Sequence, residues 1–159
     1  MKEKTERELA QSNIAENRKA YHDYHLLETF EAGIVLVGTE VKAIREGRVQ
    51  LRESYCRLQQ AEAFLLGAHI GQYSHGGSAS HDPTRPRKLL LKREELNKLL
   101  GKTTERGLTI VPLRMYFKQG RVKVVIALAK GKTGVDKRET IRRREAERET
   151  RAAVKTRRI

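Results

Sequence analysis

The chain has 159 residues, 38% of them hydrophobic, and a mean hydropathy of −0.68, which predicts one domain with a modest core and polar tails. Lys and Arg number 34 against 20 Asp and Glu, so the net charge is +14 and the pI is near 10.2. This excess favours a polyanionic partner, nucleic acid before an anionic membrane. We expect no membrane role, because the sequence contains no spanning segment, no signal peptide and no amphipathic helix with an aromatic face. The single cysteine, Cys56, permits no internal disulfide, which favours the cytoplasm.

The N-terminal region divides into a charged end and a basic–aromatic segment. Residues 1–12 alternate charges without apolar periodicity and are predicted to form a flexible N-terminus. Residues 14–33 interleave amide, basic and aromatic side chains: Asn17, Arg18, Lys19, Tyr21, His22 and Tyr24. Basic groups neutralise phosphates, while aromatic rings and amides contact bases or riboses. The spacing also allows a second interpretation, a charged lead into the first strand.

The segment 28–58 is the centre of the predicted fold. Residues 34–37 are β-branched and apolar, which predicts a buried strand that ends at Gly38. Thr39 is the predicted N-cap of a short helix, and Gly47 its predicted C-terminal end. A second strand is predicted from Val49 through residue 58.

A polar turn at residues 59–62 joins that strand to residues 63–70, which alternate with period two, so the pair predicts a hairpin. Residues 71–88 form a loop rich in Gly, Ser and Pro that ends in a basic cluster. This loop contains His75, His81 and Asp82, but their spacing, even with Cys56 recruited, matches no standard metal-ligand pattern. We therefore expect no metal.

A leucine-rich helix and a long hairpin follow. Leu96, Leu99 and Leu100 form a helical stripe, and Gly101 is the predicted residue just after the helix. Residues 107–130 give the strongest β pattern, two alternating runs joined by a short loop that contains Gly. Pro112 cannot donate to a ladder and predicts an edge or a bulge.

The last thirty residues differ in composition from the rest. Residues 130–159 carry 12 Lys and Arg against 5 Asp and Glu, which is half of the net charge. They contain no apolar stripe that faces a core, so we predict a tail that is disordered when free and helical on a polyanion. The alternative is a permanently disordered solubilising tail.

Catalytic motifs are absent from the sequence. There is no Ser/His/Asp order, no P-loop, no dinucleotide fingerprint and no pair of metal ligands. We expect a protein that is not an enzyme and that needs no cofactor.

Several segments, in this order, closely resemble the family of SsrA-binding proteins, also called small protein B. They are IAENRKAYHDY, ETFEAGIVLVGTEVKAIREG, ESYCRL, EAFLLGAHI, HDPTRPRKLLL, GLTIVPLRMYFKQGRVKVVIALAKGK and DKRETIRRREAERE, between about residues 14 and 149. The resemblance implies a mainly β fold, a closed antiparallel barrel of the oligonucleotide-binding type with short helices. The implied organisation is a flexible N-terminus at 1–12, the barrel domain at 13–132 and the basic tail at 133–159.

The resemblance implies a role in trans-translation. The expected partners are the tRNA-like domain of transfer-messenger RNA, the ribosome, chiefly its small-subunit RNA, and elongation factor Tu through the RNA complex. The rival hypothesis is a basic ribosomal or general tRNA-binding module without a role in ribosome rescue.

Motif matching assigns candidate residues. Asn17, Glu31 and Leu90 match family positions important for RNA binding. The candidate contacts around them are His22 and the basic residues Lys19, Arg87, Lys88, Lys118, Lys123, Lys130 and Lys132. In the tail, the motif Asp136, Lys137 and Arg138 matches positions that act at the decoding centre, with Arg142, Arg143 and Arg144 in the helix expected beyond it. Val135 departs from the aromatic or histidine residue of many members, so the tail's charges are expected to make the contact.

Overall fold

The structure is a computed structural model that describes residues 13–73, 81–104, 107–132, 142–146 and 148–150. Its strands are β1 (Asn13–Glu16), β2 (Tyr24–Ile34), β3 (Val49–Gln50), β4 (Tyr55–Gln59), β5 (Glu62–Leu66), β6 (His69–Ile70), β7 (Arg87–Leu90), β8 (Leu108–Lys118) and β9 (Arg121–Gly131). Its helices include α2 (Arg18–Asp23), α3 (Gly38–Arg45) and α4 (Arg93–Thr103). Residues 142–146 and 148–150 are also helical. The fold is therefore mainly β, as the sequence predicts.

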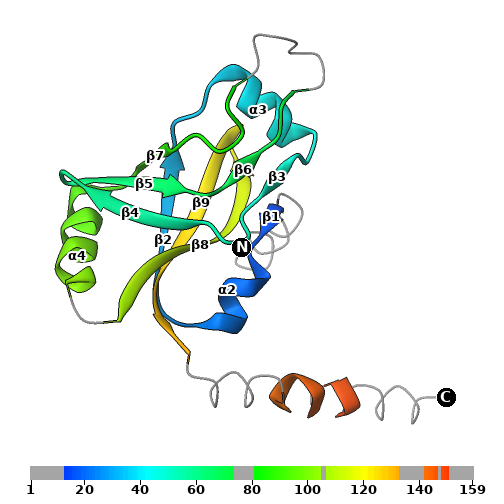
Figure 1. Cartoon of the computed structure of the whole chain (residues 1–159), viewed down its shortest axis with the longest axis vertical. Helices are drawn as coiled ribbons and strands as arrows, with labels where there is room; N and C mark the ends of the chain where they lie inside the picture. Colours follow the sequence, from blue (N-terminus) through cyan, green and yellow to red (C-terminus); the bar gives the residue numbers. More distant parts are fainter. Residues whose placement is uncertain (1–12, 74–80, 105–106, 133–141, 147, 151–159) are drawn as a thin grey trace.

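The strands close into a ring (Figure 1). The order β8-β4-β5-β7-β2-β9 is closed by the pairing of β9 with β8, and β1 is added to the outside of β8. Each of these pairings is antiparallel. The strands β3 and β6 form a separate two-stranded sheet near α3.

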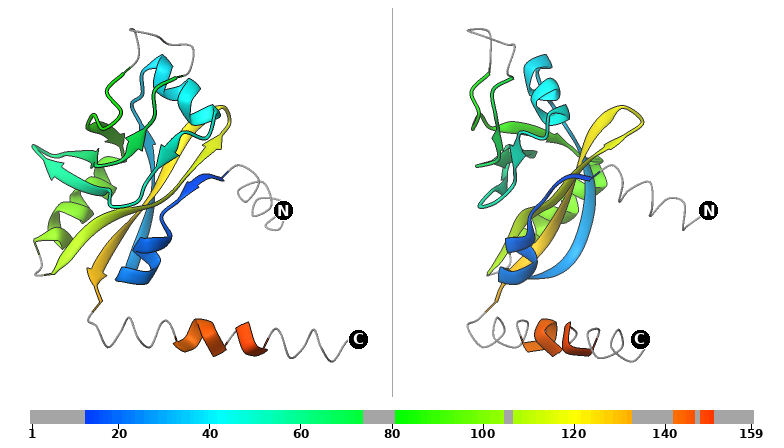
Figure 2. Two further views of the ribbon diagram at one scale, coloured as in Figure 1. Left: turned by 45° about the vertical axis from the view of Figure 1, so that its right-hand side comes forward. Right: turned by 90° about the vertical axis from the view of Figure 1, so that its right-hand side faces the viewer.

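Three long strands, β2, β9 and β8, make up one wall of the ring (Figure 2). Each has 11 residues, and β9 pairs with both neighbours. On β9, Val124 and Ile126 face the core without exposure, whereas Ala127 and Ala129 face outward and are covered by Ala20 of α2. The period-two pattern predicted for this hairpin is confirmed, and the outer face is buried as well because α2 packs on it.

Both predicted hairpins are present, and the backbone conformation of each turn is the one that a two-residue hairpin requires. The residues Gln119 and Gly120 have φ of 51° and 76°, and Gln60 and Ala61 have φ of 51° and 60°. Two successive residues with positive φ are the turn that matches strand twist in a two-residue hairpin. The predicted bulge at Pro112 is confirmed by a register shift between Pro112 and Arg114.

The strand predicted at residues 34–37 is wrong. Strand β2 ends at Ile34, and the side chains of Val35 and Val37 are 45% and 46% exposed. The N-cap of α3 is Val37 rather than Thr39, because the Glu40 carboxylate reaches back 2.9 Å to accept from the Val37 backbone N–H. The β-branched run thus lies beyond the end of the strand, in the connection to α3.

Three other boundaries also differ from prediction. The segment 63–70 breaks at Gly67, whose φ is 77°, so β5 and β6 are separate strands. The second predicted strand breaks between β3 and β4, where the Ser54 N–H donates to the Leu51 carbonyl at 3.1 Å. Helix α4 passes through Gly101 to Thr103, whereas Gly47, with φ of 78°, does follow α3 as predicted. The strand β1, the helix α2 and all of β2 before Ile34 were not predicted, and β7 begins at Arg87, inside the segment predicted as a loop.

A buried ion pair joins α3 to the first residue of β7. Arg87 and Glu40 have no exposed side-chain surface, and Arg87 Nε lies 2.5 Å from Glu40 Oε2. Arg87 also donates to the carbonyls of Ala68 at 2.8 Å and Pro83 at 3.0 Å, and Arg85 donates to Glu40 from the surface side. Because Arg87 is enclosed, it exposes no surface for a phosphate, and the role that its contacts support is a structural one.

The same contacts set the charge of Glu40. Burial alone would raise its pKa, but hydrogen bonds from Arg85, the Val37 backbone and Arg87, with the charge of Arg87, hold the pKa below the ordinary value of 4.5. The carboxylate is therefore ionised at neutral pH.

We predict that Glu40→Ala destabilises the protein by about 3–5 kcal/mol, because it leaves the Arg87 guanidinium buried without its counter-ion. The control is Glu62→Ala, which removes the surface partner of Lys88 at 3.2 Å and should cost less than about 1 kcal/mol. Urea unfolding of both variants measures the difference. Equal destabilisation by the two variants would contradict the role of the buried pair.

The same ion pair makes the stability depend on pH. Since the pKa of Glu40 is lowered on folding, the contribution of Glu40 to the free energy of unfolding is complete above pH 4.5 and is lost as the pH falls through the folded-state pKa.

Candidate nucleic-acid interface

Glu31 lies on the outer face of β2, between Phe30 and Ala32, which face the core. The Tyr116 hydroxyl donates to Glu31 Oε2, and Lys118 Nζ donates to Oε1 at 3.2 Å. Tyr116 is only 1% exposed, so its ring is fixed, whereas the side chain of Glu31 is 38% exposed. The carboxylate is therefore held in place while its outer edge remains open to a ligand.

Glu31 and its neighbours shift one another's pKa values. Burial alone would raise the pKa of Glu31, but hydrogen bonds from Tyr116 and Lys118, with the charges of Lys118 and Lys123, hold the pKa below its ordinary value. Burial and the adjacent Glu31 carboxylate raise the pKa of Tyr116, while Arg114, 5.3 Å from the ring centroid, opposes this. At neutral pH the pair is thus a carboxylate and a neutral phenol that donates to it.

Beside Glu31, Gly33 pairs with Leu90 on one side and with Lys123 on the other. A Cβ at Gly33 would lie 3.2 Å from Leu90 Cβ and 3.7 Å from Lys123 Nζ. Because Gly33 has no side chain, the surface is depressed here, between the Leu90 side chain, which is 52% exposed, and the Lys123 ammonium group. We call Glu31, Gly33, Leu90, Lys118 and Lys123 the Glu31 face.

Lys88 lies two residues before Leu90 on β7 and therefore on the same side of the strand. Its ammonium contacts Glu62 at 3.2 Å, and its side chain is 43% exposed. The structure thus places Lys88 at the margin of the Glu31 face.

The remaining candidates lie at the opposite end of the long strands. Lys123 and Lys130 are seven residues apart on β9, which corresponds to about 23 Å of strand. Lys130, Lys132 and α2, with its residues Lys19 and His22, lie at the second end, where Tyr24 pairs with Gly131. The sequence-predicted residues therefore form two groups rather than one surface.

Asn17 has a structural role in the second group. It is 4% exposed, its Nδ2 donates to the Pro112 carbonyl at 2.9 Å, and its Oδ1 accepts from the Ala20 N–H at 3.3 Å. It is thus the N-cap of α2 and ties this helix to the bulge of β8.

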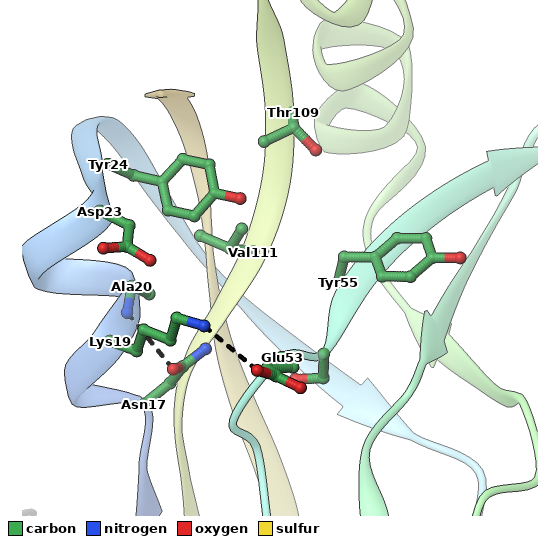
Figure 3. Close-up of a pocket in the computed structure, with 10 residues that line it drawn as sticks. Asn17, Lys19, Ala20, Asp23, Tyr24, Glu53, Tyr55, Thr109 and Val111 are labelled. Atoms are coloured by element: carbon green, nitrogen blue, oxygen red, sulfur yellow. Dashed lines mark hydrogen bonds and ion pairs between the residues drawn. The ribbon is translucent and has the colours of Figure 1, made fainter. Parts of the chain in front are cut away.

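A hollow of about 440 Å³ opens between α2 and the start of β4 (Figure 3). Its lining residues are Asn17, Lys19, Ala20, Asp23, Tyr24, Glu53, Ser54, Tyr55, Thr109 and Val111. Lys19 Nζ contacts Glu53 Oε1 at 3.2 Å across one side. Sequence reasoning missed Glu53 and Tyr55. The available signal was an aromatic residue within the strand predicted at 49–58, but nothing in the sequence placed it close to Tyr24.

The tail candidates are only partly described. Arg142, Arg143 and Arg144 are exposed on a helical turn, whereas Asp136, Lys137 and Arg138 lie outside the described residues, as does Val135.

Among the described residues, no helix is long and apolar enough to cross a membrane. Within that same part of the chain, no three or more His, Cys, Asp or Glu form a cluster that could hold a metal ion. Cys56 is buried, and burial raises the pKa of its thiol, so it is an unreactive core residue.

Comparison with known proteins gives one family. The family model for SmpB protein matches residues 14–156. An SsrA-binding protein of Shouchella clausii is 54% identical over 144 residues, covering 91% of this chain and 92% of the relative. One of Syntrophobacter fumaroxidans is 57% identical over 136 residues, covering 86% and 84%. A solved structure described as "tmRNA-SmpB: a journey to the center of the bacterial ribosome" is 48% identical, covers 80% of this chain and 94% of its own, and superposes with a TM-score of 0.65.

We predict that Tyr116→Phe raises the pKa of the Glu31 carboxyl toward 4.5, because it removes one of the donors that stabilise the charged form. Carboxyl NMR titration measures this pKa directly. The control is Tyr21→Phe, which removes a tyrosine hydroxyl on α2, at the other end of the long strands. An unchanged Glu31 pKa in Tyr116→Phe would show that the phenol does not hold the carboxylate.

Proposed function

The chain belongs to the SmpB protein family, and from this premise we propose how its residues perform the family's task. The protein binds transfer-messenger RNA and acts with it on stalled ribosomes in trans-translation. The single observation that supports this function best is the family match over residues 14–156. The rival hypothesis, a general basic module without a role in rescue, is not favoured.

We propose that the Glu31 face holds the tRNA-like domain of transfer-messenger RNA. Lys118 and Lys123 provide ammonium groups for phosphates, and Leu90 provides an apolar surface for a ribose or base. Glu31 repels phosphate, so its fixed carboxylate serves to accept from base N–H groups or a ribose hydroxyl. A carboxylate held between a phenol and a lysine has a fixed position, so it is suited to determine which nucleotide of the RNA lies against it. The lysines supply affinity.

We propose that the tail contacts ribosomal RNA. Residues 142–146 and 148–150 are helical with exposed side chains, but helices this short are marginal in water unless a partner stabilises them. Ordering on small-subunit RNA, with phosphate contacts from Lys137 and Arg138 and then from the arginines at 142–144, would offset that cost. Elongation factor Tu would act through the RNA complex.

The finer fold and cellular assignments are also proposals. We propose that the ring of strands is a barrel of the oligonucleotide-binding type spanning residues 13–132, with the basic tail at 133–159. The closed strand order supports this assignment. The N-terminal segment predicted at 1–12 lies outside the described residues. We propose further that the protein works in the cytoplasm, where ribosomes are, and that it is an adaptor rather than an enzyme.

Glu31→Ala should weaken binding to transfer-messenger RNA without lowering the thermal stability. Glu28→Ala is a matched control, because Glu28 lies on the same strand with a similar exposure, 39%, but pairs with Lys98 on α4. Filter binding and thermal melts of the two variants make the comparison. Wild-type affinity in Glu31→Ala would remove Glu31 from the binding site.

Lys118→Ala and Lys123→Ala should each reduce the slope of log affinity against log salt by about 0.7–0.9, the effect of one phosphate contact. Arg87→Lys, at an enclosed position, should leave this slope unchanged provided that the variant folds. A slope equal to wild type in both lysine variants would place the phosphates elsewhere.

Deletion from Asp136 onward should leave most affinity for transfer-messenger RNA intact but prevent peptide tagging. A reconstituted tagging assay compares the full chain, the truncation and the double change Lys137→Ala/Arg138→Ala. Circular dichroism of the free tail peptide should show little helix. If the truncated protein tags at the full rate, the tail has no function on the ribosome.

A further inference from the structure

The hollow beside α2 has no role in the function proposed above. Figure 3 shows the rings of Tyr24 and Tyr55 on opposite sides of it, at the starts of β2 and β4. Tyr55 is 47% exposed although it lies on a strand, whereas Tyr24 packs against the small cluster of α2, β8 and β9. One ring is thus supported by the core, and the other is presented to solvent.

The size and chemistry of this space suit a nucleotide. A hollow of about 440 Å³ falls in the range of about 300–1,000 Å³ typical of small-ligand sites. Stacking of an unpaired base on an aromatic ring is a common basis of single-strand recognition, and it tolerates any base because every base has a π-face.

The charges around the hollow orient such a ligand. Lys19, whose side chain is 44% exposed, lies 3.2 Å from Glu53 and is placed to meet a phosphate at the edge. Glu53 and Asp23 disfavour a phosphate inside the hollow, but their carboxylates accept from base amino groups or ribose hydroxyls. The base would enter the hollow, and its phosphate would remain at Lys19.

The position of the hollow relates it to the root of the tail. The Lys132 N–H donates to the Asp23 carbonyl at 2.8 Å, and Lys132 Nζ donates to the Tyr21 carbonyl at 3.4 Å. The chain therefore leaves β9 for the tail directly beside the hollow, at the end of the strands opposite the Glu31 face.

We propose that this hollow binds one unpaired nucleotide of RNA, with its base stacked on Tyr55 opposite Tyr24 and its phosphate at Lys19. The proposal rests on the proposed function as an RNA-binding protein. An unpaired nucleotide is available from ribosomal RNA and from transfer-messenger RNA. The neighbouring tail root, and the position of the hollow toward the end of the strands opposite the Glu31 face, favour ribosomal RNA.

The test measures binding of the full-length protein to isolated small ribosomal subunits and, separately, to transfer-messenger RNA. Tyr55→Ala should lower the affinity for one of these RNAs about tenfold, whereas Tyr55→Phe, which keeps the ring, should bind as wild type. The matched control is Tyr21→Ala, because Tyr21 is 39% exposed on α2 but does not line the hollow. Chemical probing of both RNAs should reveal a nucleotide that wild type protects and Tyr55→Ala does not, and its RNA identifies the source.

A second measurement uses the unaltered protein and does not depend on the folding of a variant. Ultraviolet cross-linking followed by mass spectrometry should give a nucleotide adduct on the peptide that contains Tyr55 or Tyr24. Unchanged affinity for both RNAs in Tyr55→Ala, an equal loss in Tyr55→Phe, or cross-links confined to other peptides would overturn the proposal. If Glu31→Ala still loses transfer-messenger RNA in that case, the proposed function stands and only this inference fails. Failure of wild type to bind either RNA would instead contradict the proposed function.

Discussion

The pairing of β2 with β9, and of β9 with β8, fixes where Glu31, Lys118, Lys123 and Lys130 lie. Registers run from Tyr24 opposite Gly131 to Gly33 opposite Lys123, so one rigid wall carries a group at each end. Strand alternation turns Glu31 outward between two core residues, and the same register brings Lys118, Lys123 and Leu90 around it. A one-residue slip of this register would turn Glu31 into the core. The register that packs the wall is therefore also the register that exposes Glu31 to a ligand.

Two residues that match RNA-binding positions of the family have structural contacts within the fold. Arg87 is enclosed with Glu40, from which it is separated by 47 positions, and Asn17 caps α2 while bonding to the Pro112 carbonyl 95 positions away. Their effect on RNA binding would be indirect. Arg87 holds β7, which carries Leu90, and Asn17 holds α2, which carries Lys19. A loss of binding on substitution of either residue is therefore expected to accompany a loss of stability, unlike a loss at Glu31.

The features that were predicted correctly depend on residues that are close in sequence. The alternation of residues 122–128 gave the core face of β9, Pro112 gave the bulge, and Gly47 gave the end of α3. The resemblance gave the family and Glu31, but not the reason that Glu31 is held by Tyr116. That contact spans 85 positions, and it arises only when the register of the wall is known. The strand predicted at 34–37 failed because the carboxylate of Glu40, bonded to the Val37 N–H, starts the helix there and overrides β propensity.

The central claim is that opposite ends of one wall contact different RNAs. Directed hydroxyl-radical probing tests it, since Cys56 is buried with a raised thiol pKa and will not compete for a cysteine-directed probe. One probe is attached at Gln119→Cys, in the turn near the Glu31 face, and another at Tyr21→Cys on α2, in the complex of protein, transfer-messenger RNA and ribosome. We predict that the first cuts transfer-messenger RNA and the second cuts small-subunit ribosomal RNA. Cuts by both probes in the same RNA, with none in the other, would contradict the account.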